Sequence, residues 1–522
     1  MVHSQEHKTQ PVCGKVKPDG PVTDIRNDRY KTWIILLGLT AGALLVHGYH
    51  PFAEDAEIYL PGIELRIDPK LFPLGREFFL SHARLTLFPN LIAFSLRVTH
   101  LPMEVGLFLW HVASIFLLLL ACWELSGLLF SGSSRTNARA VRWGGVCLIA
   151  ALLTIPVAGT ALYIMDQYLN PRNLAAFAGV FMVTRSLEKK YVSALFWLVF
   201  AAGMHPLMWV FPFSFCVLFV AMDRLKGRFG NLRKSAAGLL ASFLWLMPLA
   251  PITSAAYHEA AKQHGFHYIQ NWQWYELLGI VAPLLLLWWF ARVGRNRQWG
   301  MLQRVCHAFI VYGLIYLVMA VVFDLPARFE ALARLQPLRS LHLLYIVMFV
   351  IMGGFLGEYV LRNRIGRWLA LFVPLCMGMF LTQRSLFPAC AHLDWPGAAP
   401  KNPWKQAFIW IRQNTPTNAL FALDPEYMHI PGEDAIGFRC LAQRSRLADD
   451  GKDNGVVSMF PPLAEEWWAQ VQAQTPWPTL NANGFLRLKN MYGVTWVVVQ
   501  QPGVAGLECP YQNAAVRVCR LP

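Results

Sequence analysis

Residues 103–130 read MEVGLFLWHVASIFLLLLACWELSGLLF, a stretch in which Glu104 and Glu124 are the only acidic or basic side chains apart from His111. A helix needs about 20 apolar residues to cross the hydrocarbon core of a bilayer, with a range of roughly 17 to 25. Lipid offers no hydrogen-bond partners, so a spanning segment must satisfy its own backbone groups, as a helix does. The stretch therefore predicts a transmembrane helix, and similar runs recur from residue 33 to residue 383.

The composition agrees with a membrane protein. Of the 522 residues, 55% are hydrophobic and 15% are charged, whereas about a quarter of a soluble globular protein is charged. The net charge of +15 would suit a nucleic-acid-binding protein, but the basic residues lie in short loops between apolar runs. We find no basic helix face interleaved with aromatic residues and no nucleic-acid motif. We expect a lipid bilayer as the partner, and no nucleic acid.

The apolar runs predict about eleven spans, near 33–49, 103–130, 141–163, 172–185, 191–204, 206–222, 235–256, 273–291, 305–323, 339–361 and 366–383. Basic residues mark cytoplasmic loops. With a polar, disordered cytoplasmic tail at 1–32, the inner loops are the basic ones and the outer loops are poor in Lys and Arg. The outer stretch 164–171 has neither, and 257–272 has only Lys262. The N-terminus is therefore predicted in the cytoplasm.

Two stretches leave the span assignment open. The runs 172–185 and 191–204 hold only 14 residues each, which is short for a crossing. Either they are short spans that meet 206–222 near His205 and Pro206, or 172–185 is re-entrant and 191–222 is one long helix. The apolar stretch 84–99 is broken by Pro89 and Arg97, and we predict an interfacial helix there.

Two hydrophilic pieces are then predicted on the outer side. The first is the loop 50–102, which is long for a connection and rich in Pro, Asp and Glu. The second is a small α/β domain over 384–522. In it, NPWKQAFIWIRQNTP and EEWWAQVQ have helical spacing, ALFALDP resembles a strand, and LRLKNMYGVTWVVVQQP predicts a helix followed by a buried strand. The fold class is mainly α: a polytopic membrane bundle, 33–383, with this outer domain.

Four cysteines fall in the outer domain: Cys390, Cys440, Cys509 and Cys519. An even number on an oxidising side permits disulfides. Cys509 and Cys519 are ten residues apart and are the candidates for a pair, whereas the alternative is four buried free thiols. No Cys or His spacing in the sequence indicates a zinc site.

The densest group of chemical side chains follows the first span. The segment GYHPFAEDAEIYLPG places His50, Glu54, Asp55 and Glu57 at the predicted outer surface. The spacing of Asp55 and Glu57 suits either a divalent cation such as Mg²⁺ or Mn²⁺ or a general base. A carboxylate at an apolar interface has a raised pKa, which suits proton abstraction. The alternative is a solvated loop with helix-capping acids.

Three further groups lie at predicted outer edges. In YIMDQYLNPRN, Asp166 and Arg172 stand in an otherwise uncharged loop, and Asn170-Pro171 predicts a helix start that places Arg172 at an N-terminus suited to anions. His205, in GMHPLMW, lies between two short helices. The alternatives are a capped turn and a packed core histidine.

The fourth group is LPARFEALARLQPLRSLHLLY, with Arg328, Arg339 and His342 on the side where positive charge is disfavoured. Arginine binds phosphate in a partly buried site, so a lipid phosphate would explain these residues. The alternative is snorkelling to the headgroups. The outer domain adds the polar run GFRCLAQRSRLADDGKDNG, which either closes over a membrane-surface site or is a solvated loop.

These motifs resemble the GT-C superfamily of membrane glycosyltransferases, which use polyprenyl-phosphate sugars. The resemblance rests on HPFAEDAEIY in a long first outer loop, on about a dozen spans and on an outer domain that opens with WIRQNTPTNALF. The phrases NPRN, HPLMW and LQPLRSLHLL look like those of a bacterial branch of such proteins. The family's adjacent acidic pair is here Glu-Asp-x-Glu, which leaves the base and any metal requirement open.

The resemblance implies a site and a location. Asp55 matches the catalytic first-loop acid, Glu57 completes the pair, and Asp166 matches a second outer-loop acid. His50, Glu54, Arg172, His205, Arg328, Arg339 and His342 would bind substrate. The protein would lie in a bacterial inner membrane, with a periplasmic C-terminal domain and a glycan, lipid or protein as acceptor. The alternatives are a transporter or flippase and a non-catalytic scaffold.

Overall fold

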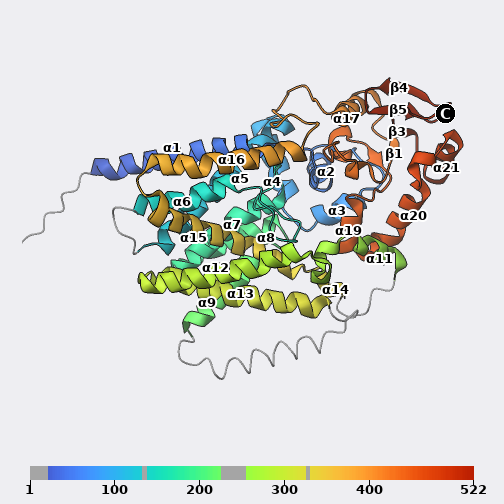
Figure 1. Ribbon diagram of the computed structural model, residues 1–522. Helices are drawn as coiled ribbons and strands as arrows, with labels where there is room; N and C mark the ends of the chain where they lie inside the picture. Colours follow the sequence, from blue (N-terminus) through green and yellow to red (C-terminus); the bar gives the residue numbers. More distant parts are fainter. Residues whose placement is uncertain (1–21, 132–137, 225–253, 325–329) are drawn as a thin grey trace, which may run out of the picture.

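The computed structural model describes residues 22–131, 138–224, 254–324 and 330–522, which form a bundle of long helices and a smaller C-terminal region at one end of it (Figure 1). The helices of the bundle are α1 (Val22–His47), α5 (Met103–Leu129), α6 (Ala138–Ala151), α7 (Pro171–Leu187), α8 (Tyr191–Met204), α9 (Val210–Arg224), α12 (Trp274–Asn296), α13 (Gly300–Asp324), α15 (Leu341–Phe355) and α16 (Ile365–Leu386). The short turns η4 (Pro337–Ser340) and η5 (Leu356–Leu361) extend α15 at its two ends.

Six helical segments in the described ranges are long and apolar enough to cross a membrane. They are Tyr30–His47, Met103–Leu129, Trp274–Asn296, Gly300–Asp324, Pro337–Leu361 and Ile365–Leu386. Large apolar side chains on several of them are exposed, among them Trp288, Leu369 and Leu381. Lipid would cover such surfaces. The chain is thus a multi-pass membrane protein with a mainly helical fold.

Several predicted boundaries change. Helix α1 begins at Val22, so the prediction of a disordered tail through residue 32 is wrong for its last part, and residues 1–21 lie outside the described ranges. Helix α6 ends at Ala151 and not near 163. The apolar residues that follow it, such as Val157 and Leu162, are buried among other segments, so their hydrophobicity reflects packing inside the protein. The predicted span 235–256 falls almost wholly outside the described residues.

The ambiguous stretch 172–222 forms three separate helices, α7, α8 and α9. The helix is interrupted between Met204 and Val210, so the alternative of one long helix over 191–222 is wrong. Helix α7 is buried along almost its whole length. None of the three reaches the length of the six long segments, in agreement with their short apolar runs.

Glycines allow two bundle helices to approach closely. A methyl group placed on Gly353 of α15 would lie 2.3 Å from the carbonyl oxygen of Gly144 in α6, and one on Gly357 would lie 2.2 Å from the carbonyl oxygen of Ala140. Small residues at such spacing are the usual means by which membrane helices bring their backbones together. The contact fixes α6 against α15.

The loop predicted on the outer side, 50–102, folds into three short helices: α2 (Ala56–Ile67), α3 (Glu77–Ala83) and α4 (Phe88–Thr99). Helix α4 buries Ile92 and Leu96, whereas Phe94 and Val98 on its other face are 66% and 61% exposed. Twelve residues are too few to span a bilayer. An exposed apolar face on a short helix fits the predicted interfacial position.

The C-terminal region is a small α/β structure, as predicted. Its elements are α17 (Pro403–Asn414), β1 (Leu420–Leu423), α18 (Arg439–Ala442), β2 (Ser445–Arg446), α19 (Asp453–Met459), α20 (Ala464–Gln474), α21 (Ala482–Tyr492), β3 (Trp496–Gln500), β4 (Glu508–Gln512) and β5 (Val516–Arg520). The strand order is β2-β1-β3-β5-β4, with β1 parallel to β2 and β3 and with β5 antiparallel to both neighbours. Helix α11 (Ala255–Lys262) packs against α19 and α20.

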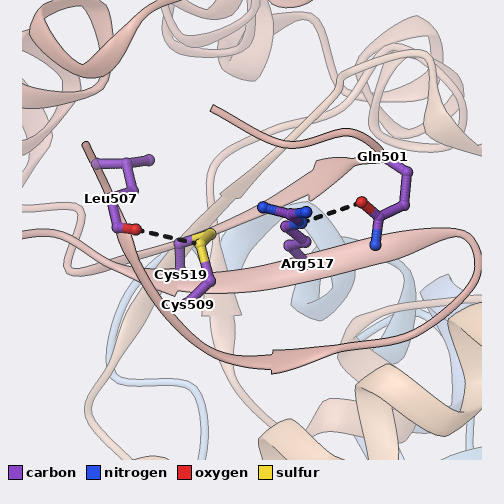
Figure 2. The surroundings of a disulfide bond; sticks show 5 residues. All are labelled: Gln501, Leu507, Cys509, Arg517 and Cys519. Carbon is purple, nitrogen blue, oxygen red and sulfur yellow. Dashed lines mark hydrogen bonds between the residues drawn. A yellow bond between two sulfur atoms is a disulfide. The ribbon is translucent and has the colours of Figure 1, made fainter. Parts of the chain in front are cut away.

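A disulfide joins Cys509 of β4 to Cys519 of β5 (Figure 2). The predicted pair is therefore present. Cys390 and Cys440 are buried free thiols, so the alternative holds for these two. The bond closes the outermost hairpin of the sheet.

Basic side chains gather at the end of the bundle opposite the C-terminal region. Arg185 pairs with Glu124, Arg142 lies over Trp123, and Arg297 lies over Tyr359. These contacts bring the ends of α5, α7, α12 and α15 and the start of α6 to one level. Within the described ranges, the helix ends that flank these predicted cytoplasmic loops therefore lie together at one end of the bundle.

Candidate functional site

A cavity of about 600 Å³ lies where the bundle meets the C-terminal region. Side chains from both parts line it, including Glu54, Asp55, Tyr59, His82, Leu85, Asp166, Tyr168, Arg172, His205, His264, His267, Gln336, Arg339, Phe387, His429, Asp434 and Lys452. Segments that are up to about 400 residues apart in sequence thus converge. Six of the ten predicted site residues are among them.

Asp55 is held at the start of α2. Its backbone N–H donates to the hydroxyl of Tyr168 at 3.3 Å. The preceding residue, Glu54, has φ = +56° and donates its N–H to the carbonyl of Ala435. A positive φ is uncommon for a residue with a side chain, and such strained positions cluster at functional sites. The turn therefore directs two adjacent carboxylates into the cavity.

Arg172 connects the first loop to the second. The side chain of Asn170 caps α7 by accepting from the N–H of Asn173 at 3.0 Å, which confirms the predicted helix start. Arg172, two residues into the helix, donates to Asp55 at 2.9 Å and to Asp166 at 3.0 Å. Its guanidinium group therefore bridges the two acids that the sequence singled out.

Lys452 reaches the same acids from the C-terminal region. Its ammonium group lies 3.1 Å from the Asp55 carboxylate and also pairs with Glu54. The sequence left open whether the polar run 437–455 closes over a site or is a solvated loop, and Lys452 of this run lines the cavity. With Arg172 it places one cation on each side of Asp55.

These cations control the ionisation of Asp55. Burial opposes the charged carboxylate, but the fields of Lys452 and Arg172 outweigh burial and hold the pKa of Asp55 well below its usual range. The sequence predicted a raised pKa, and this is wrong because two cations flank the group. Asp55 is ionised and weakly basic in this state.

A further cation in the cavity has no such partner. Arg339, in η4, makes no guanidinium hydrogen bond or ion pair with the described residues, and its Nε atom is buried without a partner. Its guanidinium carbon lies 5.9 Å from the ring centroid of Phe266. Gln336 is 7% exposed, and its Oε1 atom also lacks a partner. A buried donor without an acceptor is costly, so the cavity is suited to receive an anion at Arg339.

His205 contributes a neutral donor. Its Nδ1 atom accepts the backbone N–H groups of Leu207 and Met208, both at 3.2 Å. An accepting Nδ1 places the ring proton on Nε2. The side chain therefore caps the segment before α9 and leaves an N–H donor at the cavity wall.

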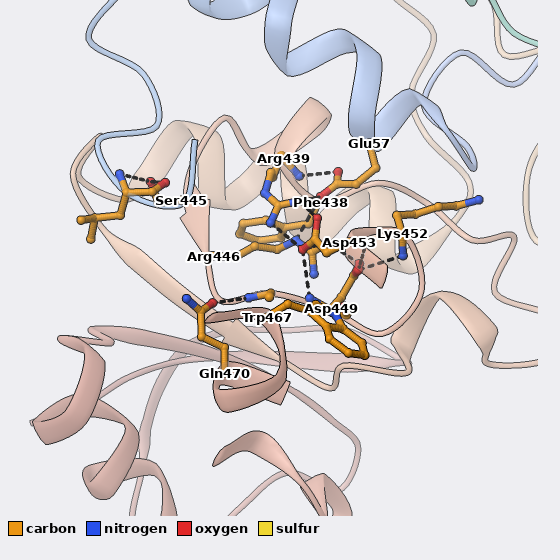
Figure 3. A network of polar contacts seen from close by, with 12 residues as sticks. Glu57, Phe438, Arg439, Ser445, Arg446, Asp449, Lys452, Asp453, Trp467 and Gln470 are labelled. Carbon is orange, nitrogen blue, oxygen red and sulfur yellow. Dashed lines mark hydrogen bonds and ion pairs between the residues drawn. The ribbon is translucent and has the colours of Figure 1, made fainter. Parts of the chain in front are cut away.

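Glu57, the second acid of the first-loop pair, does not reach the cavity. It points from α2 into the C-terminal region, where it lies 3.0 Å from Arg446 and accepts the backbone N–H of Arg439 at 2.7 Å (Figure 3). Asp449 and Asp453 complete this fully buried ionic network. The network ties the first loop to the C-terminal region, so the position of Glu57 is structural.

This geometry bears on the predicted cation site. Asp55 faces the cavity and pairs with Arg172 and Lys452, whereas Glu57 faces Arg439 and Arg446. Alternate residues at a helix start point in different directions. The two carboxylates do not converge, so they fit a shared divalent cation poorly.

The remaining predicted residues lie elsewhere. His50 is buried against the ring of Phe387, with 4.0 Å between ring centroids. His342, in α15, is buried, and its Nε2 atom lies 3.0 Å from the carbonyl oxygen of Ile164. Both stand behind the cavity wall. Arg328 lies outside the described residues.

Several cavity residues were missed. Tyr59 follows Asp55 by four positions, which is one helical turn, and this spacing was a usable signal. Tyr168 lies within the YIMDQYLNPRN motif. His82, His264 and His267 gave no signal, because only the tertiary structure brings α3 and the loop after α11 to the cavity.

No known family model matches the chain, and no curated protein sequence is significantly similar to it. The likeness to GT-C glycosyltransferases therefore rests on the motifs quoted above and remains a prediction.

Proposed function

We propose that the protein is a GT-C-type membrane glycosyltransferase that moves a sugar from a polyprenyl-phosphate donor to an acceptor hydroxyl. One observation supports this above the others. Ionised Asp55 shares a cavity at the end of the bundle with Arg172, Lys452 and Arg339, whose Nε atom has no hydrogen-bond partner among the described residues. A base beside an anion-binding group is what transfer from a lipid phosphate requires.

An exposed apolar surface next to the cavity could bind the lipid part of the donor. Leu85 lines the cavity and is 49% exposed. It leads to Leu87, just before α4, and to Phe94 and Val98 of α4, which all expose apolar side chains. A polyprenyl chain would lie along this face, with its phosphate near Arg339.

In the proposed reaction, Asp55 accepts the proton of the acceptor hydroxyl. The hydroxyl oxygen forms a bond to the anomeric carbon while the bond from that carbon to the phosphate oxygen breaks. The polyprenyl phosphate leaves with the electron pair, and Arg339 and Arg172 stabilise its growing charge. A single direct displacement inverts the anomeric centre.

The low basicity of Asp55 in the free protein fits a substrate-controlled base. A donor phosphate would attract Arg172 and Lys452 as well as Arg339, because phosphate forms bidentate bonds with guanidinium groups. As these cations move from the carboxylate to the phosphate, the pKa of Asp55 rises. The base would then become effective only when the donor is bound.

The orientation is part of the proposal. The disulfide Cys509–Cys519 is typical of an oxidising compartment, and the basic ends of α7 and α12 fit the cytoplasmic side. We therefore place the cavity and the C-terminal region in the periplasm, the N-terminus in the cytoplasm and the chain in a bacterial inner membrane. With the six long segments, the shorter helices α6, α7, α8 and α9 would give ten crossings, and the predicted span 235–256, almost wholly outside the described residues, would be the eleventh.

The first experiment identifies the donor and tests the base. Mass spectrometry of lipids that co-purify with the protein would reveal a polyprenyl-phosphate sugar, which then serves as substrate. Asp55→Asn keeps the shape and removes the base, so transfer should fall by about 10²- to 10⁴-fold. The matched control is Asp68→Asn, because Asp68 is exposed beyond α2. If Asp55→Asn transfers sugar as fast as Asp68→Asn, the proposal is wrong.

The same assay tests the metal. Arg172, Arg339 and Lys452 supply positive charge from the chain itself, so we expect transfer to survive EDTA. Loss of activity with EDTA and its return with Mg²⁺ or Mn²⁺ would contradict this expectation and favour a cation at Asp55.

A second prediction concerns the binding of a polyprenyl phosphate at Arg339. Charge-assisted hydrogen bonds contribute roughly 1.5–3 kcal/mol, so Arg339→Gln should weaken binding of undecaprenyl phosphate by about tenfold or more. Arg66→Gln is the control, since Arg66 is exposed on α2. Native mass spectrometry of protein in detergent would measure both, and equal binding by the two variants would remove Arg339 from the phosphate site.

A further inference from the structure

A second group of side chains, with atoms that could coordinate a metal ion, lies behind the cavity wall. His50 follows α1, and Cys390 and Asp394 follow α16. Potential ligand atoms of the three residues lie within 4.8 Å of one another. The backbones are fixed to each other, because Tyr49 N–H donates to the carbonyl of His392 and Asp394 N–H donates to the carbonyl of Tyr49, both at 3.0 Å.

The described residues do not satisfy the hydrogen-bonding capacity of the His50 imidazole ring. His50 is 1% exposed, and neither ring nitrogen has a hydrogen-bond partner in the part of the chain that the structure describes. Its Nδ1 atom lies 3.7 Å from the Asp394 carboxylate, which is beyond a normal hydrogen bond. Buried polar groups are almost always paired, so a ligand at His50 would account for this ring.

The atoms that these three side chains offer for coordination favour a particular metal ion. Cys390 is a free thiol that is 3% exposed, and Asp394 adds a carboxylate that also pairs with Lys405 at 3.3 Å. Imidazole nitrogen, thiolate sulfur and carboxylate oxygen together favour zinc among the common divalent ions. A thiolate and a carboxylate would balance its two positive charges.

We propose that His50, Cys390 and Asp394 form a zinc site that joins the end of α1 to the segment that follows α16. Ligand atoms around tetrahedral zinc lie roughly 3.5 Å apart, which small side-chain rotations can reach from the observed spread. Water or His392 completes the coordination; the Nδ1 atom of His392 is also buried without a partner. The ion positions Phe387, which packs on His50 and lines the cavity.

The test uses the full chain in detergent, stripped of metal and titrated with Co²⁺. Cobalt in such a site gives a thiolate charge-transfer absorption band. We expect about one equivalent of Co²⁺ with this band, displaced by Zn²⁺. Cys390→Ser should abolish the band and weaken metal binding at least about tenfold. Cys376→Ser, which changes a free thiol of α16 outside the group, should keep both.

A wild-type measurement removes any dependence on how the variant folds. Zinc should protect Cys390, but not Cys376, from alkylation, as measured by mass spectrometry of the peptides. The proposal fails if the wild-type protein binds no Co²⁺ in stoichiometric amount. It fails equally if the band persists in Cys390→Ser or if zinc leaves the alkylation of Cys390 unchanged. None of these results depends on sugar transfer.

Discussion

At the scale of single residues, neighbours in sequence have separate roles. Asp55 and Glu57 are two positions apart, yet Asp55 contacts cations in the cavity and Glu57 is enclosed in an ionic network with Arg439 and Arg446. Burial is the largest influence on Glu57 and raises its pKa, although both guanidinium groups favour the charged form. Asp55 is therefore placed to act on a substrate in the cavity, whereas Glu57 ties α2 to the C-terminal region.

This network predicts a large loss of stability from one substitution. Arg439 forms two bonds with Asp453, at 2.9 and 2.8 Å, and is 2% exposed. Arg439→Met removes one of the two guanidinium groups that pair with the buried carboxylates, and breaking a buried ion pair typically costs about 3–5 kcal/mol. Thermal unfolding in detergent should show a clear fall in the melting temperature. Arg412→Met is the control, because Arg412 is exposed on α17, and equal melting of the two variants would contradict a structural role for the network.

At the scale of secondary-structure elements, close contact between α6 and α15 supports the cavity. Helix α15 continues from η4, which carries Arg339, and the chain that leaves α6 forms the loop with Asp166. The glycines of this contact therefore set the distance between two walls of the site. Helix α2 in turn is held by the C-terminal region through Glu57.

The glycine contact is open to a direct test. In Gly353→Ala the new methyl group would lie 2.3 Å from the carbonyl oxygen of Gly144, so the helices must separate. Overpacking of this kind costs about 1–3 kcal/mol, and the melting temperature in detergent should fall. Gly378→Ala in α16, where no atom lies within 4 Å of the added methyl group, should melt like the wild type or slightly higher. A similar change in both variants would show that the contact is not tight.

At the scale of the whole molecule, charge is divided between the two ends of the bundle. One end carries arginines such as Arg142, Arg185 and Arg297, and the other carries the cavity. This division follows the orientation rule for membrane proteins. Chemistry in the cavity would then take place on a single side of the bilayer.

The orientation predicts a labelling pattern in intact cells. Asp68 is exposed in the loop 50–102, which the orientation places outside, and Asn296 is exposed at the end of α12. A membrane-impermeant maleimide should label Asp68→Cys from outside and should reach Asn296→Cys only after permeabilisation. The reverse pattern would invert the orientation, and labelling of both from outside would contradict a bilayer-spanning α12. Peptide mass spectrometry separates this labelling from that of native cysteines.

Much of the architecture follows from the sequence alone. Long apolar runs must be helical in lipid, so the six long segments and the C-terminal α/β region were predictable, as was the pairing of Cys509 with Cys519. Local motifs also identified Asp55, Asp166 and Arg172, because charges in apolar surroundings stand out. These inferences need only the chemistry of neighbouring residues.

Other features depend on contacts between distant segments. The tertiary structure separates Asp55 from Glu57, brings Lys452 to Asp55 and ends α6 before residue 163. It also leaves the Nε atom of Arg339 without a hydrogen-bond partner within the described ranges. Direction and pKa are set by what packs opposite a side chain, and here those partners are up to about 400 residues away. A hydropathy pattern records that a residue avoids water; whether lipid or protein surrounds it is decided when the chain folds.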